Sequence, residues 1–349
     1  MKRLRIDLER FDDYAKQKYL SRVEHPTLPL ILYNYTDKTQ YERQWDDVTT
    51  IARGLIVDQS GLVVANPFPK FFNLDEHLAL FGSLPNQNYT VTEKVYGSLG
   101  IAVNYKGTLV VATRGSFTSE QATVARRMIE ESGFICVLGL TYLFEIVYPE
   151  NRIVVDYGET RELVLLGLRH PDGREWSPRE GAAGWHWRRA REYTMTLDEA
   201  QNYHSARLIE GFVIRFQDGI RVKVKTEEYR TLHKLVSGIT PKSLVESLRD
   251  GKTVGEVLEG LPDEHPLWDT GRELEETYRL LLINLEDLVS SVEHLPARKE
   301  QARVLSQSPL RSAAFLALDG KDPSREIWKV ILGGLSTDNV DKLNSSTSS

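Results

Sequence analysis

Residues 211–225 read GFVIRFQDGIRVKVK, and this stretch decides the fold class. Two apolar runs, Gly211–Phe216 and Arg221–Lys225, lie on either side of Asp218-Gly219, a dipeptide that favours the tight turn of a β-hairpin. The same pattern of short apolar runs between Gly, Asp, Asn and Pro extends from about residue 28 to 235, and it predicts strands joined by turns. The sequence therefore predicts an α+β fold whose first part is mainly sheet.

Further runs have the length and apolar content of strands. They are Leu30–Tyr33, Gly54–Asp58, Leu62–Ala65, Thr90–Glu93, Ile101–Tyr105, Thr108–Thr113, Tyr142–Val147 and Leu163–Leu168. Lys106-Gly107 joins two of these runs as a second tight turn. Helices are expected to be few in this part. The clearest is predicted over residues 119–132, where Ser119 can cap the first turn and an apolar stripe forms the inner face.

After residue 238 the apolar period changes from that of strands to that of helices. One stripe recurs at three- and four-residue steps and predicts a long helix: Leu274, Tyr278, Leu281, Leu285, Leu288, Val292 and Leu295. Thr240-Pro241 predicts the start of an earlier helix. We expect an all-α C-terminal domain over residues 239–335, either a packed bundle or a coiled-coil seam, and a disordered, Ser-rich tail over 336–349.

Composition narrows the class of protein. The 349 residues include 44 Lys and Arg and 50 Asp and Glu, which gives a net charge of −6, and 41% are hydrophobic. These values predict about two domains with real cores and disfavour a general polyanion binder, although nucleic acid can still bind at a local basic groove. No apolar run is long enough to span a membrane, and Cys136 has no second cysteine for a disulfide. We expect a soluble, unexported, cytoplasmic protein in which oxygen or His ligands hold any metal.

A lysine stands between a predicted strand and a Gly-Ser turn in the stretch VTEKVYGSLG, residues 91–100. In that position Lys94 can act as a nucleophile. Attack by an amine requires its neutral form, which burial or neighbouring cations favour. For this segment taken by itself, a solvated lysine beside a turn is the alternative.

Two glutamates interrupt the apolar pattern. Glu145 lies in the middle of a predicted strand, between Phe144 and Ile146, and Glu210 stands directly before the strand that begins at Gly211. A buried carboxylate without a partner is unfavourable, so each of them should meet a cation, a hydroxyl or a metal. The alternative is that each is a surface charge.

Arg221, Lys223 and Lys225 alternate with valines, and the period of two places them on one face of a strand. A row of like charges is destabilising unless it faces an anion, and phosphate is the natural candidate. A solvated outer face of the sheet is the alternative. Upstream, Arg53 precedes a strand and Lys70 precedes two phenylalanines. Both signals are weak alone, and Lys70 also fits a surface charge beside aromatic core residues.

Together and in this order, the segments resemble the motifs of the covalent nucleotidyltransferase superfamily of ATP-dependent ligases and capping enzymes. The lysine turn resembles the nucleophile motif, residues 142–147 and 210–215 the third and fourth motifs, and residues 223–225 the fifth. A narrower resemblance is to the first-type RNA ligases of T-even bacteriophages, which repair tRNA. It is carried by Ala52–Gly54, Lys70–Leu74, Pro149–Val154 and Lys225–Tyr229 within about residues 30 to 235.

This resemblance implies a nucleotidyltransferase, or adenylylation, domain over residues 1–238 and a reaction in three steps. Lys94 would attack the α-phosphate of ATP and release pyrophosphate, AMP would pass to an RNA 5′-phosphate, and a 3′-hydroxyl would displace it. Mg²⁺ or Mn²⁺ would assist. The substrate would be RNA with such ends, for example a tRNA nicked in its anticodon loop, and a polynucleotide kinase-phosphatase is a candidate partner. The compartment would be the cytoplasm, or the host cytoplasm for a phage-encoded chain.

The resemblance also implies roles for individual residues. The nucleotide contacts would be Tyr33, Arg53, Lys70, Glu145, Glu210, Lys223 and Lys225. Glu145 would contact the ribose, and Glu210 would help to organise metal and nucleotide. Lys223 and Lys225 would hold the α-phosphate and act with Lys94 as catalytic residues. Arg114, Tyr229 and Tyr96 would contact RNA or phosphate.

Tyr96 departs from the family pattern, which usually has an acidic residue two positions after the nucleophile. A phenol cannot supply that negative charge, so sealing would be weakened or the substrate end altered. Tyr96 would instead stack on or hydrogen-bond to a nucleotide or an RNA sugar, and an ordinary strand-end aromatic is the alternative. Asp250 is a weak candidate for an acidic metal ligand from the C-terminal part.

The C-terminal part favours an RNA ligase within the superfamily. DNA ligases and capping enzymes follow the fifth motif with a β-barrel, whereas residues 240–335 read as helices, which the resemblance links to the choice of RNA substrate. The segment Trp185–Arg189, WHWRR, fits an RNA contact or a helix that mixes core tryptophans with surface arginines. The alternative functions are a non-sealing RNA-end-binding homologue and another nucleotidyltransferase, a DNA ligase or a guanylyltransferase.

Overall fold

The computed structural model describes residues 4–148, 160–176, 184–205, 209–259, 261 and 266–338. The chain divides into two compact units after Tyr229. Helix α6, Glu227–Gly238, runs across this division, so the unit boundary lies earlier than the sequence-based boundary after residue 238.

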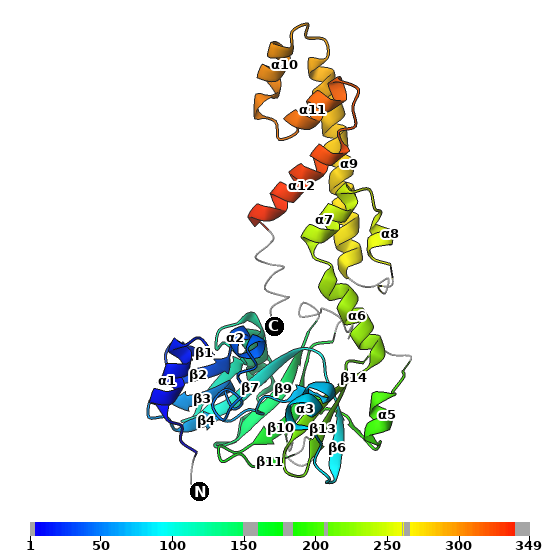
Figure 1. Ribbon diagram of the computed structural model, residues 1–349. Coiled ribbons are helices and arrows are strands. Elements are labelled where there is room, and N and C mark those ends of the chain that lie inside the picture. Colours follow the sequence, from blue (N-terminus) through cyan, green and yellow to red (C-terminus); the bar gives the residue numbers. More distant parts are fainter. Residues whose placement is uncertain are drawn as a thin grey trace. The chain divides into compact units, whose positions relative to one another are not determined.

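The first unit combines helices with three sheets (Figure 1). The first sheet is an antiparallel meander in the order β1-β2-β3-β4: β1 (Leu20–Glu24), β2 (Leu30–Tyr35), β3 (Arg53–Asp58) and β4 (Val63–Ala65). The second sheet is antiparallel in the order β11-β10-β9-β7-β8: β7 (Ser98–Tyr105), β8 (Thr108–Thr113), β9 (Thr141–Val147), β10 (Glu162–Arg169) and β11 (Glu175–Trp176). The third has the order β12-β6-β13-β14-β5: β5 (Phe72–Asn73), β6 (Tyr89–Glu93), β12 (Glu192–Tyr193), β13 (Gly211–Phe216) and β14 (Arg221–Lys225). In this third sheet β14 and β5 run parallel, and the other pairs are antiparallel.

Each strand predicted from the sequence corresponds to a strand of the structure, and both predicted turns join antiparallel neighbours. The structure adds β1 and three strands of two residues each, which are too short to show a period. Helices are more frequent than predicted: α1 (Leu8–Lys16), α2 (Asp37–Tyr41), α3 (Leu74–Phe81), α4 (Glu120–Ser132) and α5 (Leu197–Gln201). Only α4 was predicted, and Ser119 caps it as expected by accepting a hydrogen bond from the Ala122 N–H.

Layers of apolar side chains hold the first two sheets and their helices together. On β7 and β9, Ile101 and Leu143 point toward Leu32 and Ile56 of the first sheet. The alternate residues of the same two strands, such as Phe144, join a second cluster that contains the inner face of α4. On its other side the first sheet packs against α1. The period of two thus gives the second sheet two buried faces.

The third sheet is apolar on one face and basic on the other. Phe212, Ile214, Val222 and Val224 form its core with residues of α3 and α5. The strand register pairs Arg215 with Arg221, Val213 with Lys223 and Gly211 with Lys225. The predicted placement of the three β14 cations on a single face is therefore confirmed.

In the second unit, all the described elements are helices: α7 (Pro241–Arg249), α8 (Val254–Val257), α9 (Pro266–Val292), α10 (Arg298–Val304), the 3-10 helix η2 (Leu305–Gln307), α11 (Arg311–Leu318) and α12 (Ser324–Asp338). Thr240 caps α7 as predicted. The apolar stripe lies along α9, although Leu295 lies beyond its end, and Tyr278 stacks on Trp328 of α12. Contacts of α9 with α7, α8, α11 and α12 favour a packed bundle over a coiled-coil seam.

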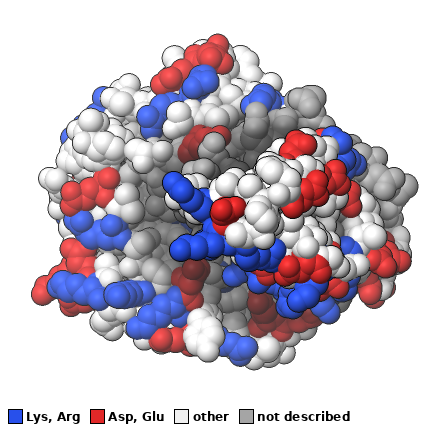
Figure 2. Space-filling model, turned by 90° about the horizontal axis from the view of Figure 1, so that it is seen from above, with Lys and Arg blue, Asp and Glu red and all other residues white. Residues whose placement is uncertain are grey.

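Two expectations concern the ends and surface of the chain. Helix α12 continues to Asp338, so residues 336–338, which were expected to lie in the tail, are helical, and residues 339–349 lie outside the described part. No helix of the described residues is long and apolar enough to cross a membrane. Figure 2 shows acidic and basic side chains mixed over the face that it presents, as the net charge of −6 leads one to expect.

Candidate active site

The lysine turn links two sheets. Residues 94–97 connect β6 of the third sheet to β7 of the second. The register of β6 with β13 pairs Glu93 with Phe212, and the Lys94 N–H donates to the Gly211 carbonyl at 2.8 Å. On the other side of the turn, Leu99 pairs with Glu145 of β9. The strand registers therefore bring Lys94 close to both glutamates that the sequence singled out.

Gly97 permits this close approach. A Cβ atom at this position would lie 2.5 Å from the Ile146 carbonyl oxygen and 2.9 Å from the Cγ of Glu145. Both distances are shorter than real side chains tolerate, so a larger residue would push the turn away from β9. The glycine of the predicted nucleophile motif thus has a steric role beside Glu145.

Lys94 and Lys225 share one buried carboxylate. The Lys94 Nζ lies 2.5 Å from Oε2 of Glu210, and the Lys225 Nζ lies 3.8 Å from Oε1 of the same side chain. The Glu210 side chain is only 4% exposed, whereas that of Lys94 is 22% exposed. The neighbouring Thr226 N–H donates to the Glu210 carbonyl and fixes its backbone. The structure thus gives Glu210 the cationic partners that its burial requires, and leaves the Lys94 amine partly accessible.

Glu145 and Lys223 complete the surroundings of this group. Loss of contact with water raises the pKa of the Glu145 carboxyl to about 7, an effect that Lys94 opposes and Glu210 reinforces. Burial, together with the positive charges of Lys94 and Arg53, lowers the pKa of Lys223 well below its ordinary value. These groups therefore act on one another electrostatically although they come from different sheets.

A second group of cations continues from Lys223. Phe71 lies against two of them, with its ring centroid 4.8 Å from the Lys223 Nζ and 5.3 Å from the Arg53 Cζ. Arg114 donates a 2.9 Å hydrogen bond to the Tyr35 hydroxyl. The Lys70 Nζ lies among aromatic rings, with centroid distances of 4.7 Å to Trp45, 5.2 Å to Tyr35 and 5.2 Å to Phe72.

Together, the two groups bring most of the expected site residues into one place. We name as the nucleotide cluster Lys94, Glu145, Glu210, Lys223, Lys225, Arg53, Lys70 and Arg114. Sequence reasoning missed the aromatic residues beside it, above all Tyr35, Trp45 and Phe71. Nothing in the sequence directly indicated a site role for these aromatic residues, because their pattern is that of ordinary core residues.

Tyr33 is the expected nucleotide contact that the structure does not bring to the nucleotide cluster. Its side chain is fully buried and packs edge-on against Phe11. Its hydroxyl donates a hydrogen bond to Oδ1 of Asp12, with 2.5 Å between the two oxygens. Helix α1 covers this part of β2, and its Asp12 carboxylate accepts the hydrogen bond of the Tyr33 hydroxyl. Tyr35, two residues further on, takes the position beside the cations.

The two tyrosines that the sequence linked to RNA or phosphate lie near each other. The rings of Tyr96 and Tyr229 have centroids 6.1 Å apart and are tilted by 57°. The Lys225 Nζ lies 5.0 Å from the Tyr229 centroid. Tyr229 is 2% exposed, while Tyr96 is only partly buried. Tyr96, which stands where the resemblance leads one to expect an acidic residue, therefore lies at the edge of the nucleotide cluster.

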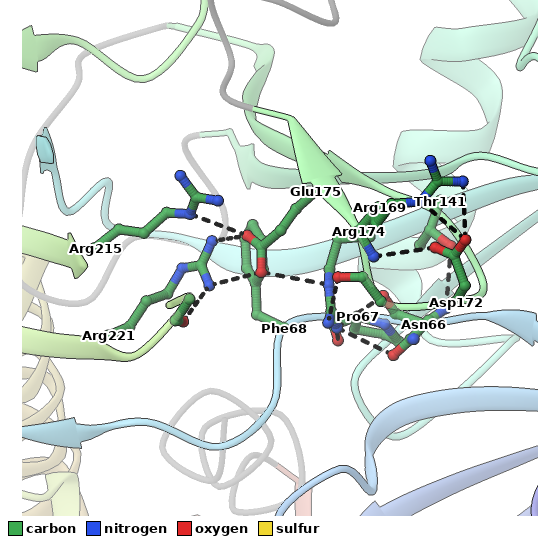
Figure 3. Close-up of polar contacts among 12 residues, drawn as sticks. Asn66, Pro67, Phe68, Thr141, Arg169, Asp172, Arg174, Glu175, Arg215 and Arg221 are labelled. Atoms are coloured by element: carbon green, nitrogen blue, oxygen red, sulfur yellow. Dashed lines mark hydrogen bonds and ion pairs between the residues drawn. The ribbon is translucent and has the colours of Figure 1, made fainter. Parts of the chain in front are cut away.

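Arg221 does not join the nucleotide cluster, contrary to the idea that the whole row faces an anion. Both terminal nitrogens of Arg221 donate hydrogen bonds to the carboxylate of Glu175 on β11. The guanidinium also stacks on Phe68, with its Cζ 4.0 Å from the ring centroid (Figure 3). Glu175 also pairs with Arg169 at 3.6 Å and Arg215 at 3.4 Å. We name these four charged residues the Glu175 cluster. At this end of the row, a carboxylate of the protein takes the place of the expected anion.

Arg169 ties the Glu175 cluster to the segment before Lys70. It donates hydrogen bonds to the Asn66 side chain at 3.0 Å and to the carbonyls of Pro67 and Gly173 (Figure 3). Although burial opposes ionisation of Glu175, Arg221, Arg169 and Arg215 hold the pKa of its carboxyl below the ordinary value. Glu175 is therefore an anion under neutral conditions.

Other expected site residues have different surroundings. Trp185 belongs to the core and Arg188 pairs with Glu162 and Glu93, so the structure favours the core interpretation of Trp185–Arg189, although this segment is not a helix. Asp250 lies in the second unit, 3.1 Å from Arg249. The segment 149–154 lies outside the described residues. Within the described part of the chain, no group of three or more His, Cys, Asp and Glu side chains is arranged to hold a metal.

The nucleotide cluster has the chemical features of a phosphoryl-transfer site. A lysine amine is partly accessible next to a carboxylate, and five further cations lie around it. Cations placed in advance stabilise the charge that develops on transferring phosphates. The arrangement can thus bind a polyphosphate and present an amine to it.

Comparisons with known proteins point in the same direction. A family model described as RNA ligase matches residues 51–229, which is 179 of the 349 residues. The "Putative bifunctional polynucleotide kinase/RNA ligase" of Autographa californica nuclear polyhedrosis virus is 27% identical over 256 residues, 64% of this chain and 35% of that protein. The "Putative RNA ligase" of Thermovibrio ammonificans is 27% identical over 192 residues, half of each chain.

The chain therefore spans between a third and a half of the length of these curated relatives. Among solved structures, form 2 of an archaeal ATP-dependent RNA ligase is similar with a TM-score of 0.47 and 15% identity, over 86% of this chain and 87% of that one. The family match covers more than half of the sequence and includes every residue of the nucleotide cluster. This chain belongs to the RNA ligase family.

Proposed function

We propose that this protein is an ATP-dependent RNA ligase that joins RNA 3′-hydroxyl and 5′-phosphate ends. In the first step the Lys94 Nζ forms a bond to the α-phosphorus of ATP, and the bond to the β-phosphate oxygen breaks, which releases pyrophosphate. The AMP then passes to the oxygen of an RNA 5′-phosphate and frees Lys94. Finally, a 3′-hydroxyl attacks the activated phosphate, AMP leaves, and a phosphodiester forms.

The observation that carries this proposal is the position of Lys94 within the nucleotide cluster. Its amine lies 2.5 Å from Glu210, a distance at which the carboxylate can hold the proton that the amine must lose before attack. Lys223 and Lys225, on the same strand, are suited to neutralise the α-phosphate. Among the described residues, Arg53, Lys70, Arg114 and Lys223 form no ion pair with a carboxylate, and so they remain available for the other phosphates.

Mg²⁺ or Mn²⁺ fits this site, although the described residues form no complete metal cage. Mg²⁺ is commonly held by one or two carboxylates together with substrate phosphates and water. Glu210 and Glu145 are the carboxylates that would hold it, and the bound cation would neutralise phosphate charge and orient the triphosphate. The raised pKa of Glu145, about 7, would fall beside such a cation.

We extend the proposal to the other parts of the chain. Residues 1–238 form the adenylylation domain, and the helical domain over residues 239–335 contributes to the choice of RNA, such as a nicked tRNA. The relative from the baculovirus is named for a kinase as well as a ligase, which supports a polynucleotide kinase-phosphatase as the activity that prepares the RNA ends. The cytoplasm, of the organism or of an infected host, is the proposed compartment, because the single cysteine calls for no oxidising environment.

The test is covalent labelling with ATP. The purified protein is incubated with α-labelled ATP and Mg²⁺, and the product is analysed by denaturing electrophoresis and mass spectrometry. We expect an AMP adduct on Lys94, no adduct in Lys94→Ala, and a normal adduct in Lys329→Ala, which removes a lysine that pairs with Glu326 on α12. Modification of Lys94→Ala would show that the nucleophile is another residue.

Tyr96 favours a second candidate, a non-sealing protein that binds RNA ends. The acidic residue usual in the family at this position is absent, and the phenol stands at the edge of the nucleotide cluster. Such a protein would bind 5′-phosphorylated RNA without releasing pyrophosphate from ATP. A DNA ligase or a guanylyltransferase would instead be revealed by sealing of nicked DNA or by labelling with GTP.

A further inference from the structure

Tyr35 and Tyr33 lie two residues apart on β2, yet their hydroxyls have opposite surroundings. The Tyr33 hydroxyl donates to a carboxylate, Asp12, whereas the Tyr35 hydroxyl accepts from a cation, Arg114, at 2.9 Å. Both side chains are at most 5% exposed, so neither hydroxyl is in free contact with solvent. A buried phenol oxygen that accepts from a guanidinium supplies partial negative charge beside Arg114, which forms no ion pair with a carboxylate of the described residues.

Three cations from three different segments meet at Tyr35. Arg114 follows β8, and its Cζ lies 5.1 Å from the Tyr35 ring centroid in addition to the hydrogen bond. Lys70, from the segment before β5, places its Nζ 5.2 Å from the same centroid. Arg53 begins β3, whose register with β2 pairs it with Asn34, next to Tyr35. Although burial opposes ionisation, Arg114, Arg53 and Lys70 lower the pKa of the Tyr35 phenol from its ordinary value.

The backbone packing keeps these cations close together. A Cβ atom on Gly54 would lie 3.2 Å from the Arg114 Cα and 2.5 Å from a methyl group of Ile101, and the residue has φ +81°. A glycine is therefore needed for β3 to pass so near Arg114. Like charges held at this spacing repel one another, and none of these three cations forms an ion pair with a carboxylate of the described residues.

We propose that Tyr35 is a positioning residue whose ring and hydroxyl hold Arg114, Arg53 and Lys70 in place to receive the β- and γ-phosphates of ATP and the pyrophosphate that leaves. This inference rests on the proposed function of the same site. Tyr35 touches the cations rather than the reacting atoms, so its effect passes through them. It belongs to the first step and to its reversal, and has no part in joining RNA that already carries AMP.

The decisive comparison is Tyr35→Phe against Tyr33→Phe, because each removes one buried hydroxyl from the same strand and keeps the ring. Isothermal calorimetry with inorganic tripolyphosphate measures the binding site without any reaction. We expect binding to weaken about tenfold or more in Tyr35→Phe, as for loss of a hydrogen bond to a charged group, and to stay at the wild-type value in Tyr33→Phe. Equal binding by the two variants, or no binding by the wild type, would overturn the proposal.

Kinetics separate positioning from a general loss of structure. In Tyr35→Phe, the KM for ATP in self-adenylylation and the pyrophosphate concentration that reverses it should both rise about tenfold. Sealing of RNA supplied with a preformed 5′-adenylate should change less than about twofold, because this step involves no polyphosphate. A parallel loss in sealing would mean a merely structural role. If the wild-type protein binds tripolyphosphate but forms no adduct with ATP, the proposed function fails, and weaker binding by Tyr35→Phe would still show that Tyr35 positions these cations for a polyphosphate.

A double-mutant cycle tests whether Tyr35 acts through Arg114. With Arg114→Gln already present, adding Tyr35→Phe should weaken tripolyphosphate binding by less than about twofold. A full tenfold loss in this background would show that the hydroxyl acts on the ligand independently of Arg114 and would contradict the positioning role.

Discussion

The basic face of β13 and β14 carries two clusters of the same chemical type that differ in how their charges are balanced. In the Glu175 cluster, three arginines converge on one carboxylate, and protein carbonyls take further hydrogen bonds from them (Figure 3). In the nucleotide cluster, six cations face only Glu210 and Glu145, and the pKa of Glu145 is raised to about 7. In the Glu175 cluster every arginine pairs with a carboxylate of the protein, whereas in the nucleotide cluster only Lys94 and Lys225 do so among the described residues.

Neighbouring cations of one strand face can therefore differ in their partners, and the alternation in the sequence does not show which partner each has. Arg221 and Lys223 are two residues apart on one strand and share a face. Arg221 meets Glu175 from β11, so its burial is balanced by an ion pair. Lys223 has no such partner among the described residues, and burial together with the positive charges of its neighbours lowers its pKa. We therefore expect substitutions in the Glu175 cluster to change stability and substitutions in the nucleotide cluster to change activity.

The largest effect is expected for Lys223→Met. Loss of a cation that neutralises the transferring phosphate should slow self-adenylylation about a thousandfold, or about 4 kcal/mol. The melting temperature should not fall, because removal of a desolvated lysine relieves its repulsion with Lys94 and Arg53. Rapid-quench labelling and calorimetric melting measure the two quantities. An equal loss in stability would show that Lys223 has a structural role like that of the arginines in the Glu175 cluster.

Glu175→Gln should lower the stability of the protein and leave the rate of adenylylation nearly unchanged. The amide keeps hydrogen-bond acceptance but leaves the buried Arg169 and Arg221 and the partly buried Arg215 without a counter-charge, which should cost about 3 kcal/mol in the free energy of unfolding. Because the pKa of Glu175 is lowered in the folded state, the ionised carboxylate stabilises above its unfolded pKa, and this contribution is lost as pH falls. Urea unfolding at pH 7 and at pH 4 should show the difference between wild type and variant shrink in acid. Adenylylation measured below the melting range should change less than about threefold.

Glu145→Gln should alter the pH dependence of stability. The folded-state pKa of about 7 lies above the unfolded value, so the protonated carboxyl favours folding at low pH and this contribution is lost as pH rises through 7. With allowance for its partial exposure, we expect wild type to lose about 2 kcal/mol relative to Glu145→Gln between pH 5 and pH 8. Chemical unfolding at several pH values, without nucleotide or metal, measures this. A constant difference would show that Glu145 is ionised throughout.

The smallest effect is expected for Arg221→Lys. The charge beside Glu175 is kept, but the two-nitrogen contact and the stacking on Phe68 are lost, which should cost about 1 kcal/mol. Equilibrium unfolding with Arg10→Lys as the surface control measures it, because Arg10 also contacts a carboxylate, Asp47, through two nitrogens but is exposed. If Arg221→Lys were as harmful as Glu175→Gln, the geometry of the pair would matter as much as its charge.

Local chemistry made part of the fold and site predictable. The strands at 211–216 and 221–225 follow from their apolar content and the Asp-Gly turn, and the α4 start follows from a side-chain cap at Ser119. The lysine turn and the two glutamates were singled out because charged residues in apolar strands require partners. That Glu210 meets Lys94 at 2.5 Å agrees with this physical argument. The roles of these residues in catalysis remain predictions.

Other features could not be predicted from the sequence, because they depend on which distant residues pack against a side chain. The strands of two residues, β5 and β11, have no period to read, yet β11 carries Glu175. Tyr33 and Tyr35 share a strand and a face, and only α1 on one side and Arg114 on the other separate a core residue from a neighbour of the nucleotide cluster. No pattern within β2 could tell them apart.

The sequence by itself determined the two kinds of structure in this chain, the turns of its hairpins, and which residues of each strand share a face. These properties arise from interactions between residues a few positions apart, which periodicity and turn chemistry record. Only tertiary packing brings Arg221 to Glu175, leaves Lys223 without an ion pair among the described residues, and places Arg114 against the Tyr35 hydroxyl. These pairings join residues 46 and 79 positions apart, and they are set by which sheet edges and loops meet when the core packs.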